Sequence, residues 1–110
     1  MADWLTNYEH EIRRGTAARR DGNEGMARVC ARRAAGELVR AHIKRTGLVP
    51  AGASVLNLLK ALRDAEETPA DVSELAGHFI LQITEDHVLP GDVDLLSDAE
   101  RLREALFPED

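Results

Sequence analysis

The chain has 110 residues, 44% of them hydrophobic and 31% charged, and its formal net charge at neutral pH is −6. This composition excludes a disordered chain, whose apolar surface would be too small to offset the entropy lost on folding. The length is that of one domain, which we expect to span residues 1–110, and no apolar run approaches the roughly 20 residues that cross a bilayer, so we expect no membrane contact.

Two features bear on the location of the protein. The single cysteine, Cys30, has no partner for an intramolecular disulfide, which favours a reducing compartment. The first residues, Met1 to Trp4, have neither the basic start nor the apolar stretch of a secretory signal. We therefore expect a cytoplasmic protein.

Helical periodicity begins close to the N-terminus. Apolar residues at three- and four-residue steps predict a first helix from Asp3 to about Arg20, followed by a tight turn over residues 21–23. A second helix is predicted from about Glu24 to Arg45, ended by Gly47. Alanines give this helix a face of small residues, which allows close helix approach and which we expect to form the seam of a homodimer.

A third and a fourth helix are predicted in the second half of the chain. Ser54 is a plausible N-cap for a short third helix that continues to about residue 62. Thr68 and Pro69 predict the start of a fourth helix, because threonine is a common N-cap and proline is favoured at the first helical position. Pro90 and Gly91 end this segment.

A short fifth helix is predicted near the C-terminus. Ser97 and Glu100 stand at the spacing of a capping box, ahead of Leu102 and Leu106. No run reads as a strand. The predicted fold is therefore all-α, an up-down antiparallel four-helix bundle with a short fifth helix at the C-terminus.

Residues that could carry chemistry are few. Cys30 lies on an apolar stripe, Ser54 and Ser97 are at capping positions, and Ser73 is at the start of a helix, so each is expected to have a structural role. Glu74 and His78 are one helical turn apart, but no third metal ligand accompanies them, and a solvated helix face is the simpler interpretation. We expect no catalytic residue, no metal and no cofactor.

Charge is distributed unevenly along the chain. Residues 1–47 hold 10 Lys and Arg against 6 Asp and Glu, whereas residues 48–110 hold 4 against 14. Arg33, Arg40 and Lys44 share one face of the second helix, and arginine suits phosphate binding through its planar fork of donors. The alternative, which we favour, is that acids of the C-terminal half, or of a second subunit, compensate these cations.

Much of the chain resembles the prokaryotic HEPN domain. The resemblance is carried by an early tryptophan, Trp4, by the turn at residues 20–23, by the alanine-rich helix over residues 27–44, and by the segments 54–62 and 72–86, which resemble that family's third and fourth helices. It implies a helical bundle that dimerises and associates with nucleotides, RNA or a partner nucleotidyltransferase.

The chain departs from the HEPN members that cleave RNA. Their motif is an arginine followed, after a gap of four to six residues, by a histidine, and no histidine here has that spacing. The family's Arg-Tyr-Pro segment appears as Val88-Leu89-Pro90, and the usual glutamate of the alanine-rich helix falls at Gly36. Ser54 stands where many members have a histidine. These differences argue against ribonuclease activity.

The first hypothesis is a non-catalytic HEPN-like module that forms a homodimer and binds RNA, a nucleotide or a protein partner. Its candidate nucleic-acid-binding residues are Arg33, Arg40, His42 and Lys44. One alternative is a divergent ribonuclease or nucleotide-processing protein that uses His42 beside Arg40 and Lys44. Another is a structural subunit of a larger assembly, whose acidic C-terminal half binds a basic partner.

Overall fold

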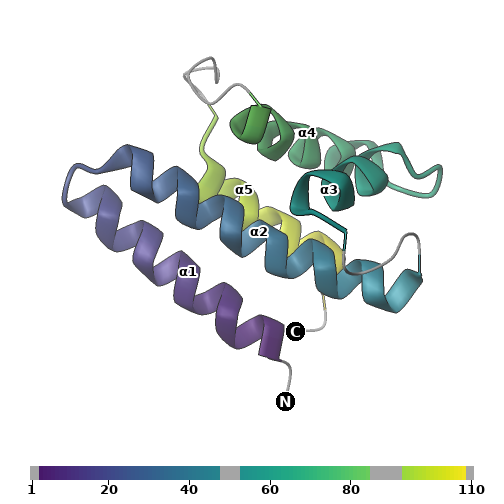
Figure 1. Ribbon diagram of the computed structural model, residues 1–110, viewed down its shortest axis with the longest axis horizontal. Helices are drawn as coiled ribbons and strands as arrows, with labels where there is room; N and C mark the ends of the chain where they lie inside the picture. Colours follow the sequence, from purple (N-terminus) through teal and green to yellow (C-terminus); the bar gives the residue numbers. More distant parts are fainter. Residues whose placement is uncertain (1–2, 48–52, 85–92, 109–110) are drawn as a thin grey trace.

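The structure, a computed structural model, describes residues 3–47, 53–84 and 93–108, and within these ranges all regular structure is α-helical (Figure 1). The all-α prediction is confirmed. The chain forms five helices in these ranges: α1 (Asp3–Arg20), α2 (Glu24–Thr46), α3 (Val55–Asp64), α4 (Ala70–Thr84) and α5 (Leu95–Leu106). None of them combines the length and the apolar composition needed to cross a membrane.

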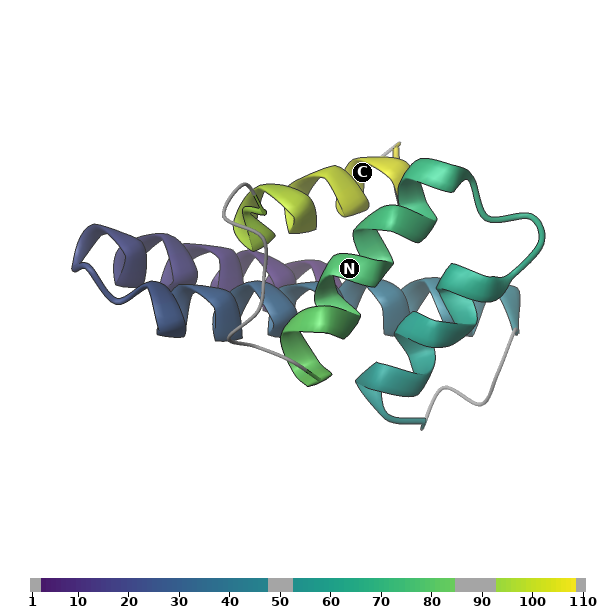
Figure 2. The same ribbon diagram turned by 90° about the horizontal axis from the view of Figure 1, so that it is seen from above.

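The helix α2 lies at the centre of the molecule and contacts each of the other four helices. The first two helices form an antiparallel hairpin whose turn includes Gly22, at a φ of +80°. The helices α3 and α4 form a second hairpin that lies across α2 on the side away from α1, and α5 runs alongside α2 in the same direction (Figures 1 and 2). Residues from the two ends of the chain therefore come together around α2.

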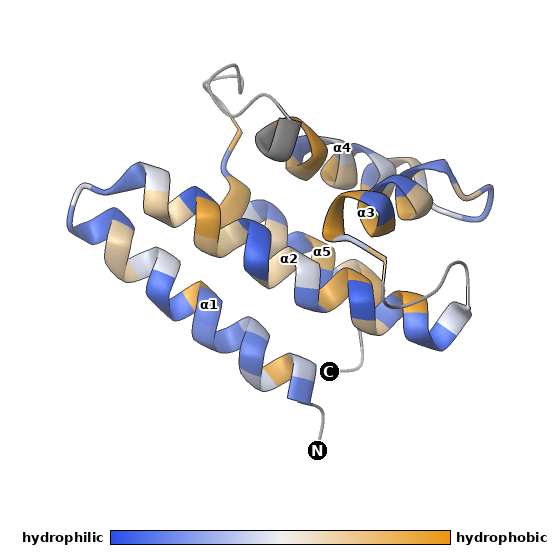
Figure 3. Cartoon of the chain, in the orientation of Figure 1, coloured by the Kyte–Doolittle hydropathy of each residue, from blue (hydrophilic) through white to orange (hydrophobic). Residues whose placement is uncertain are grey.

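The hydrophobic core lies where these helices meet. Figure 3 shows mainly hydrophilic residues along the outer side of α1 and hydrophobic residues where α2, α3, α4 and α5 lie close together. The side chains of Leu38, Leu58, Phe79 and Leu102, one from each of α2, α3, α4 and α5, are all less than 2% exposed. Burying four side chains of this size stabilises the fold by several kcal/mol, at about 1.5–3 kcal/mol each.

The small-residue face of α2 is buried within one chain. Ala27, Ala31, Ala34 and Ala35 are all fully buried. Their small side chains allow α1 and α5 to pack closely on α2, and both helices do contact it. The prediction that this face forms the seam of a homodimer is therefore wrong, because the chain's own helices cover it.

The ends of the helices follow local capping chemistry. Ser54 Oγ accepts a hydrogen bond from the Asn57 N–H at 3.2 Å, as predicted, and Gly47 ends α2 with a φ of +68°. The helix α4 begins at Ala70, one residue after the predicted Pro69. Pro90 and Gly91, predicted to end the fourth helical segment, lie outside the described residues.

The start of α5 differs from the prediction. Its N-cap is Asp94, whose Oδ1 accepts from the Ser97 N–H at 3.3 Å, so the cap lies three residues before the predicted one. Ser97 is the residue whose N–H is capped, and it does not act as the cap. The earlier start places Leu95 and Leu96 on the helix, where both are buried in the core.

Candidate nucleic-acid interface

The predicted cations Arg33, Arg40 and Lys44 form a strip along one face of α2, here called the cationic strip. The side chains of Arg33 and Lys44 are exposed. Arg40 is partly buried, and its Nη1 donates to the carbonyl oxygen of Ala53 at 3.2 Å. Glu37 lies between these cations, and its Oε1 accepts from Asn7 Nδ2 of α1 at 3.2 Å. The strip is thus supported by α1 on one side and by the residues before α3 on the other.

A groove runs beside the cationic strip, between the start of α1 and the C-terminal half of α2. Its volume is about 370 Å³, and it is lined by Asp3, Trp4, Asn7, Glu37, Arg40, Ala41 and Lys44. The ring of Trp4 stacks on Phe107, with 4.2 Å between the ring centroids. An aromatic side chain therefore lies next to the cations, because α1 and α2 run antiparallel and bring residue 4 close to residues 41 and 44.

The structure places His42 away from the cationic strip. Successive residues of an α-helix are about 100° apart, so a side chain two positions from Arg40 and from Lys44 projects to another side of α2. There His42 lines a second groove, together with residues of α3, α4 and α5. Burial, followed by the nearby charge of Arg45, lowers the pKa of His42. Arg40 and Lys44 therefore line one groove and His42 lines another, although the three were grouped together in the sequence.

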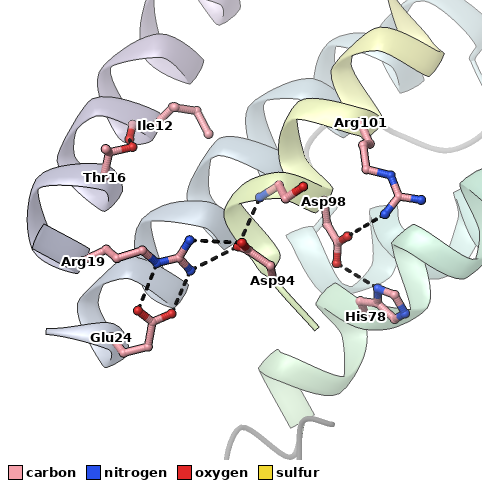
Figure 4. A network of polar contacts seen from close by, with 9 residues as sticks. Ile12, Thr16, Arg19, Glu24, His78, Asp94, Asp98 and Arg101 are labelled. Atoms are coloured by element: carbon pink, nitrogen blue, oxygen red, sulfur yellow. Dashed lines mark hydrogen bonds and ion pairs between the residues drawn. The ribbon is translucent and has the colours of Figure 1, made fainter. Parts of the chain in front are cut away.

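Compensation of the N-terminal cations by C-terminal acids is limited in the described residues. Arg19 bridges the two halves of the chain, with Nη1 and Nη2 donating to the two oxygens of Asp94, each at 3.1 Å (Figure 4). Its Nη2 also donates to Glu24 at 2.8 Å. Arg33 and Lys44, by contrast, have no ion pair in the part of the chain that the structure describes.

The Arg19 contacts shift the pKa values of both carboxyl groups. Burial acts to raise the pKa of Asp94, but the hydrogen bonds from Arg19 and from the Ser97 N–H outweigh it and lower the pKa. The hydrogen bond from Arg19 also lowers the pKa of Glu24. Because these three residues connect α1, α2 and the start of α5, the network has a structural role in holding the three elements together.

A second polar contact connects α4 and α5. His78 Nδ1 lies 2.8 Å from Asp98 Oδ2, and Arg101 Nη1 lies 3.5 Å from the other oxygen of the same carboxylate (Figure 4). Asp98 is only 4% exposed. The interpretation of His78 as part of a solvated face with Glu74 is therefore wrong. No local spacing relates residues 78 and 98, so sequence periodicity could not have found the pair.

The His78–Asp98 pair is half of a possible catalytic arrangement. A carboxylate that orients an imidazole is typical of sites where the imidazole activates a hydroxyl or thiol nucleophile. Within the described ranges, no serine, threonine or cysteine side chain is hydrogen-bonded to His78. The geometry therefore indicates a contact that stabilises the packing of α4 on α5 rather than an assembled nucleophile.

The residues considered as nucleophiles have structural positions. Cys30 is fully buried, and burial, together with the nearby charge of Glu11, raises the pKa of its thiol. Ser73 Oγ donates to the carbonyl oxygen of Arg63 at 2.8 Å. Among the described residues, no three side chains of His, Cys, Asp or Glu lie close enough together to hold a metal ion.

Comparisons of the chain with protein-family models, with curated proteins and with solved structures found no match. The resemblance to HEPN domains therefore stays a prediction from the sequence. The cationic strip and the groove beside it are the features that bear on function.

Proposed function

We propose that the protein is a non-catalytic, HEPN-like helical module that binds single-stranded RNA along the cationic strip of α2. The observation that carries this proposal is the exposure of Arg33 and Lys44, neither of which has an ion pair among the described residues. Exposed cations that form no ion pair are available to phosphate groups, whereas paired cations such as Arg19 are not.

The spacing of the strip suits a polyanionic strand. With a rise of about 1.5 Å per residue, Arg33 and Lys44 are roughly 16 Å apart along the axis of α2. Two exposed cations at this interval can contact different phosphates of one strand. Trp4, whose ring stacks on Phe107, lines the adjoining groove, so an aromatic side chain lies beside the cations.

Binding of labelled single-stranded RNA, measured by fluorescence anisotropy at several salt concentrations, tests the proposal. The double variant Arg33→Gln/Lys44→Gln removes two phosphate contacts and should reduce the slope of log K against log[salt] by about 1.4, at roughly 0.7 per contact. Arg40 is left unchanged because its hydrogen bond to Ala53 has a structural role.

The matched control for this experiment is Arg20→Gln/Lys60→Gln, which makes the same change in charge at exposed positions outside the strip. The control variant should bind RNA nearly as well as the wild type. Equal losses in both double variants would show that binding follows net charge alone. Absence of binding at low salt would contradict the proposal altogether.

The proposal also includes the remaining expectations from the family resemblance. These are an up-down antiparallel four-helix bundle with a short fifth helix, a cytoplasmic location, a homodimer, and a nucleotidyltransferase or other protein partner. The dimer seam must lie outside the alanine face of α2, since that face is buried within the chain. Light scattering that shows a strict monomer at tens of micromolar protein would contradict the homodimer.

Two alternatives have less support. In a divergent ribonuclease that used His42 beside Arg40 and Lys44, all three side chains would have to contact the same substrate. His42, however, lines one groove, and Arg40 and Lys44 line another. RNA turnover by the pure protein that His42→Ala abolishes would nevertheless establish it. The second alternative is a structural subunit with an acidic binding face. Salt-sensitive co-purification of one defined basic partner would support this hypothesis.

A further inference from the structure

The groove that contains His42 lies on another side of α2 from the cationic strip. It is formed where α2, α3 and α5 end and where α4 begins, and its volume is about 680 Å³. It is lined by His42, Thr46, Leu62, Ala65, Glu67, Thr68, Pro69, Asp71, Val72, Ala105 and Leu106. This volume falls within the roughly 300–1,000 Å³ typical of small-molecule sites.

The walls of this groove are suited to an apolar group. Leu62 and Val72 are buried core residues that reach its surface, and Leu106 is partly exposed. Five of the eleven lining residues have polar side chains, among them the hydroxyls of Thr46 and Thr68. Apolar walls with a small number of polar groups are the usual composition of a pocket that binds the body of an organic molecule.

The charged side chains that line the groove are acidic, which favours a positively charged ligand. Glu67 and Asp71 are exposed at its edge, and neither has an ion pair in the described part of the chain. No lysine or arginine is among the residues that line it. Arg45, whose charge contributes to lowering the pKa of His42, packs its guanidinium over the ring of Phe107 at 5.1 Å and is not part of the lining.

Helix ends add to this negative potential. Three helices, α2, α3 and α5, end at the groove, and the C-terminus of a helix carries partial negative charge. The N-terminus of α4 opposes them and partly offsets Asp71, which lies in its first turn. The neutral imidazole of His42 has a lone pair that can accept a hydrogen bond. The groove thus favours a cationic N–H donor over an anion.

We propose that this groove binds a small organic cation that has an apolar body and a protonated amine. The apolar body packs against Leu62, Val72 and Leu106, and the ammonium group lies near Glu67 and Asp71. This site is independent of the RNA-binding proposal, because none of these residues belongs to the cationic strip.

Three probes of similar size and different charge test the proposal: phenylbutylamine, phenylbutanol and phenylbutyrate. Titrations into the full chain are followed by two-dimensional amide NMR spectra. We expect saturable shifts of the amides of Thr46, Thr68 and Val72 with the amine, weaker binding of the alcohol, and none of the carboxylate. Absence of saturable binding by the amine, shifts confined to other regions, or equal binding of the carboxylate would each overturn the proposal.

A double variant that replaces both acids by their amides distinguishes the contribution of the acids to binding from that of the apolar walls. Glu67→Gln/Asp71→Asn should reduce the preference for the amine over the alcohol by about fivefold, as expected for two exposed ion pairs. The matched control, Glu66→Gln/Glu74→Gln, changes two exposed acids outside the lining and should keep the wild-type preference. An unchanged preference in the first variant would overturn the role of Glu67 and Asp71, and with it the proposed cation site.

Discussion

Replacing Gly15 with alanine tests how closely α1 packs on α2 and α5. A β-carbon at Gly15 would lie 2.7 Å from Leu96 Cδ2 and 3.1 Å from Cys30 Cβ. The same substitution at Gly77, in the middle of α4, is the matched control, because no described atom lies within 4 Å of the new β-carbon. Both glycines are inside helices, so the two variants share the same gain in helix propensity.

The expected magnitudes follow from these contacts. Alanine is favoured over glycine inside a helix by about 1 kcal/mol, so Gly77→Ala should raise the free energy of unfolding by roughly that amount. At Gly15 this gain is opposed by overpacking, which costs about 1–3 kcal/mol in a well-packed core. Leu96 can move its terminal methyl group, but Cys30 Cβ is attached to the backbone of α2. The variant Gly15→Ala should therefore be about 1–3 kcal/mol less stable than Gly77→Ala.

Urea unfolding followed by circular dichroism, at one protein concentration for all variants, measures the difference. The slope of the free energy with urea should be the same in each case, since similar surface is exposed on unfolding. If Gly15→Ala stabilised the protein as much as Gly77→Ala does, α1 could not lie as close to Cys30 and Leu96 as the structure places it. That result would refute the packing of α5 against the α1–α2 hairpin.

Two further predictions concern polar residues. Asp94→Ala removes both the N-cap of α5 and the ion pair with Arg19, and should lower the free energy of unfolding by about 1–2 kcal/mol in the same urea assay. Arg19→Met removes the ion pair but keeps the cap, and should lower it by less than about 1 kcal/mol. Equal losses of stability in the two variants would contradict the capping role of Asp94. Because the folded state lowers the pKa of His42 below its ordinary value of 6.5, the free energy of unfolding should fall as the pH drops through 6.5 and level off below the folded-state pKa. His42→Gln should reduce this pH dependence, and an unchanged profile would contradict it.

Features that depend on neighbours along the chain were predictable. The cap at Ser54 and the end of α2 at Gly47 follow from side-chain and backbone preferences within about four residues. The start of α5 was predicted three residues late, because both Asp94 and Ser97 are common N-caps. Burial of Leu95 and Leu96 stabilises the earlier start, and this burial depends on the other helices.

In the candidate sites, too, local features could be predicted from the sequence and contacts between helices could not. The cationic strip could be predicted, because Arg33, Arg40 and Lys44 are separated by steps that keep them on one helix face. The groove beside it could not, since it depends on Trp4 of α1 lying next to the C-terminal half of α2. The grouping of His42 with the strip followed sequence proximity, although a helix places residues two positions apart on different sides.

The amino-acid sequence by itself was sufficient to determine that the chain is all-helical and approximately where each helix lies, because helical periodicity and capping are local properties. Which faces meet depended on the packing of complete helices against one another. Arg19 and Asp94 are 75 residues apart and His78 and Asp98 are 20 apart, and no pattern within one helix relates either pair. Such contacts form only where the crossing of helices and the volumes of buried side chains bring distant segments within hydrogen-bond distance.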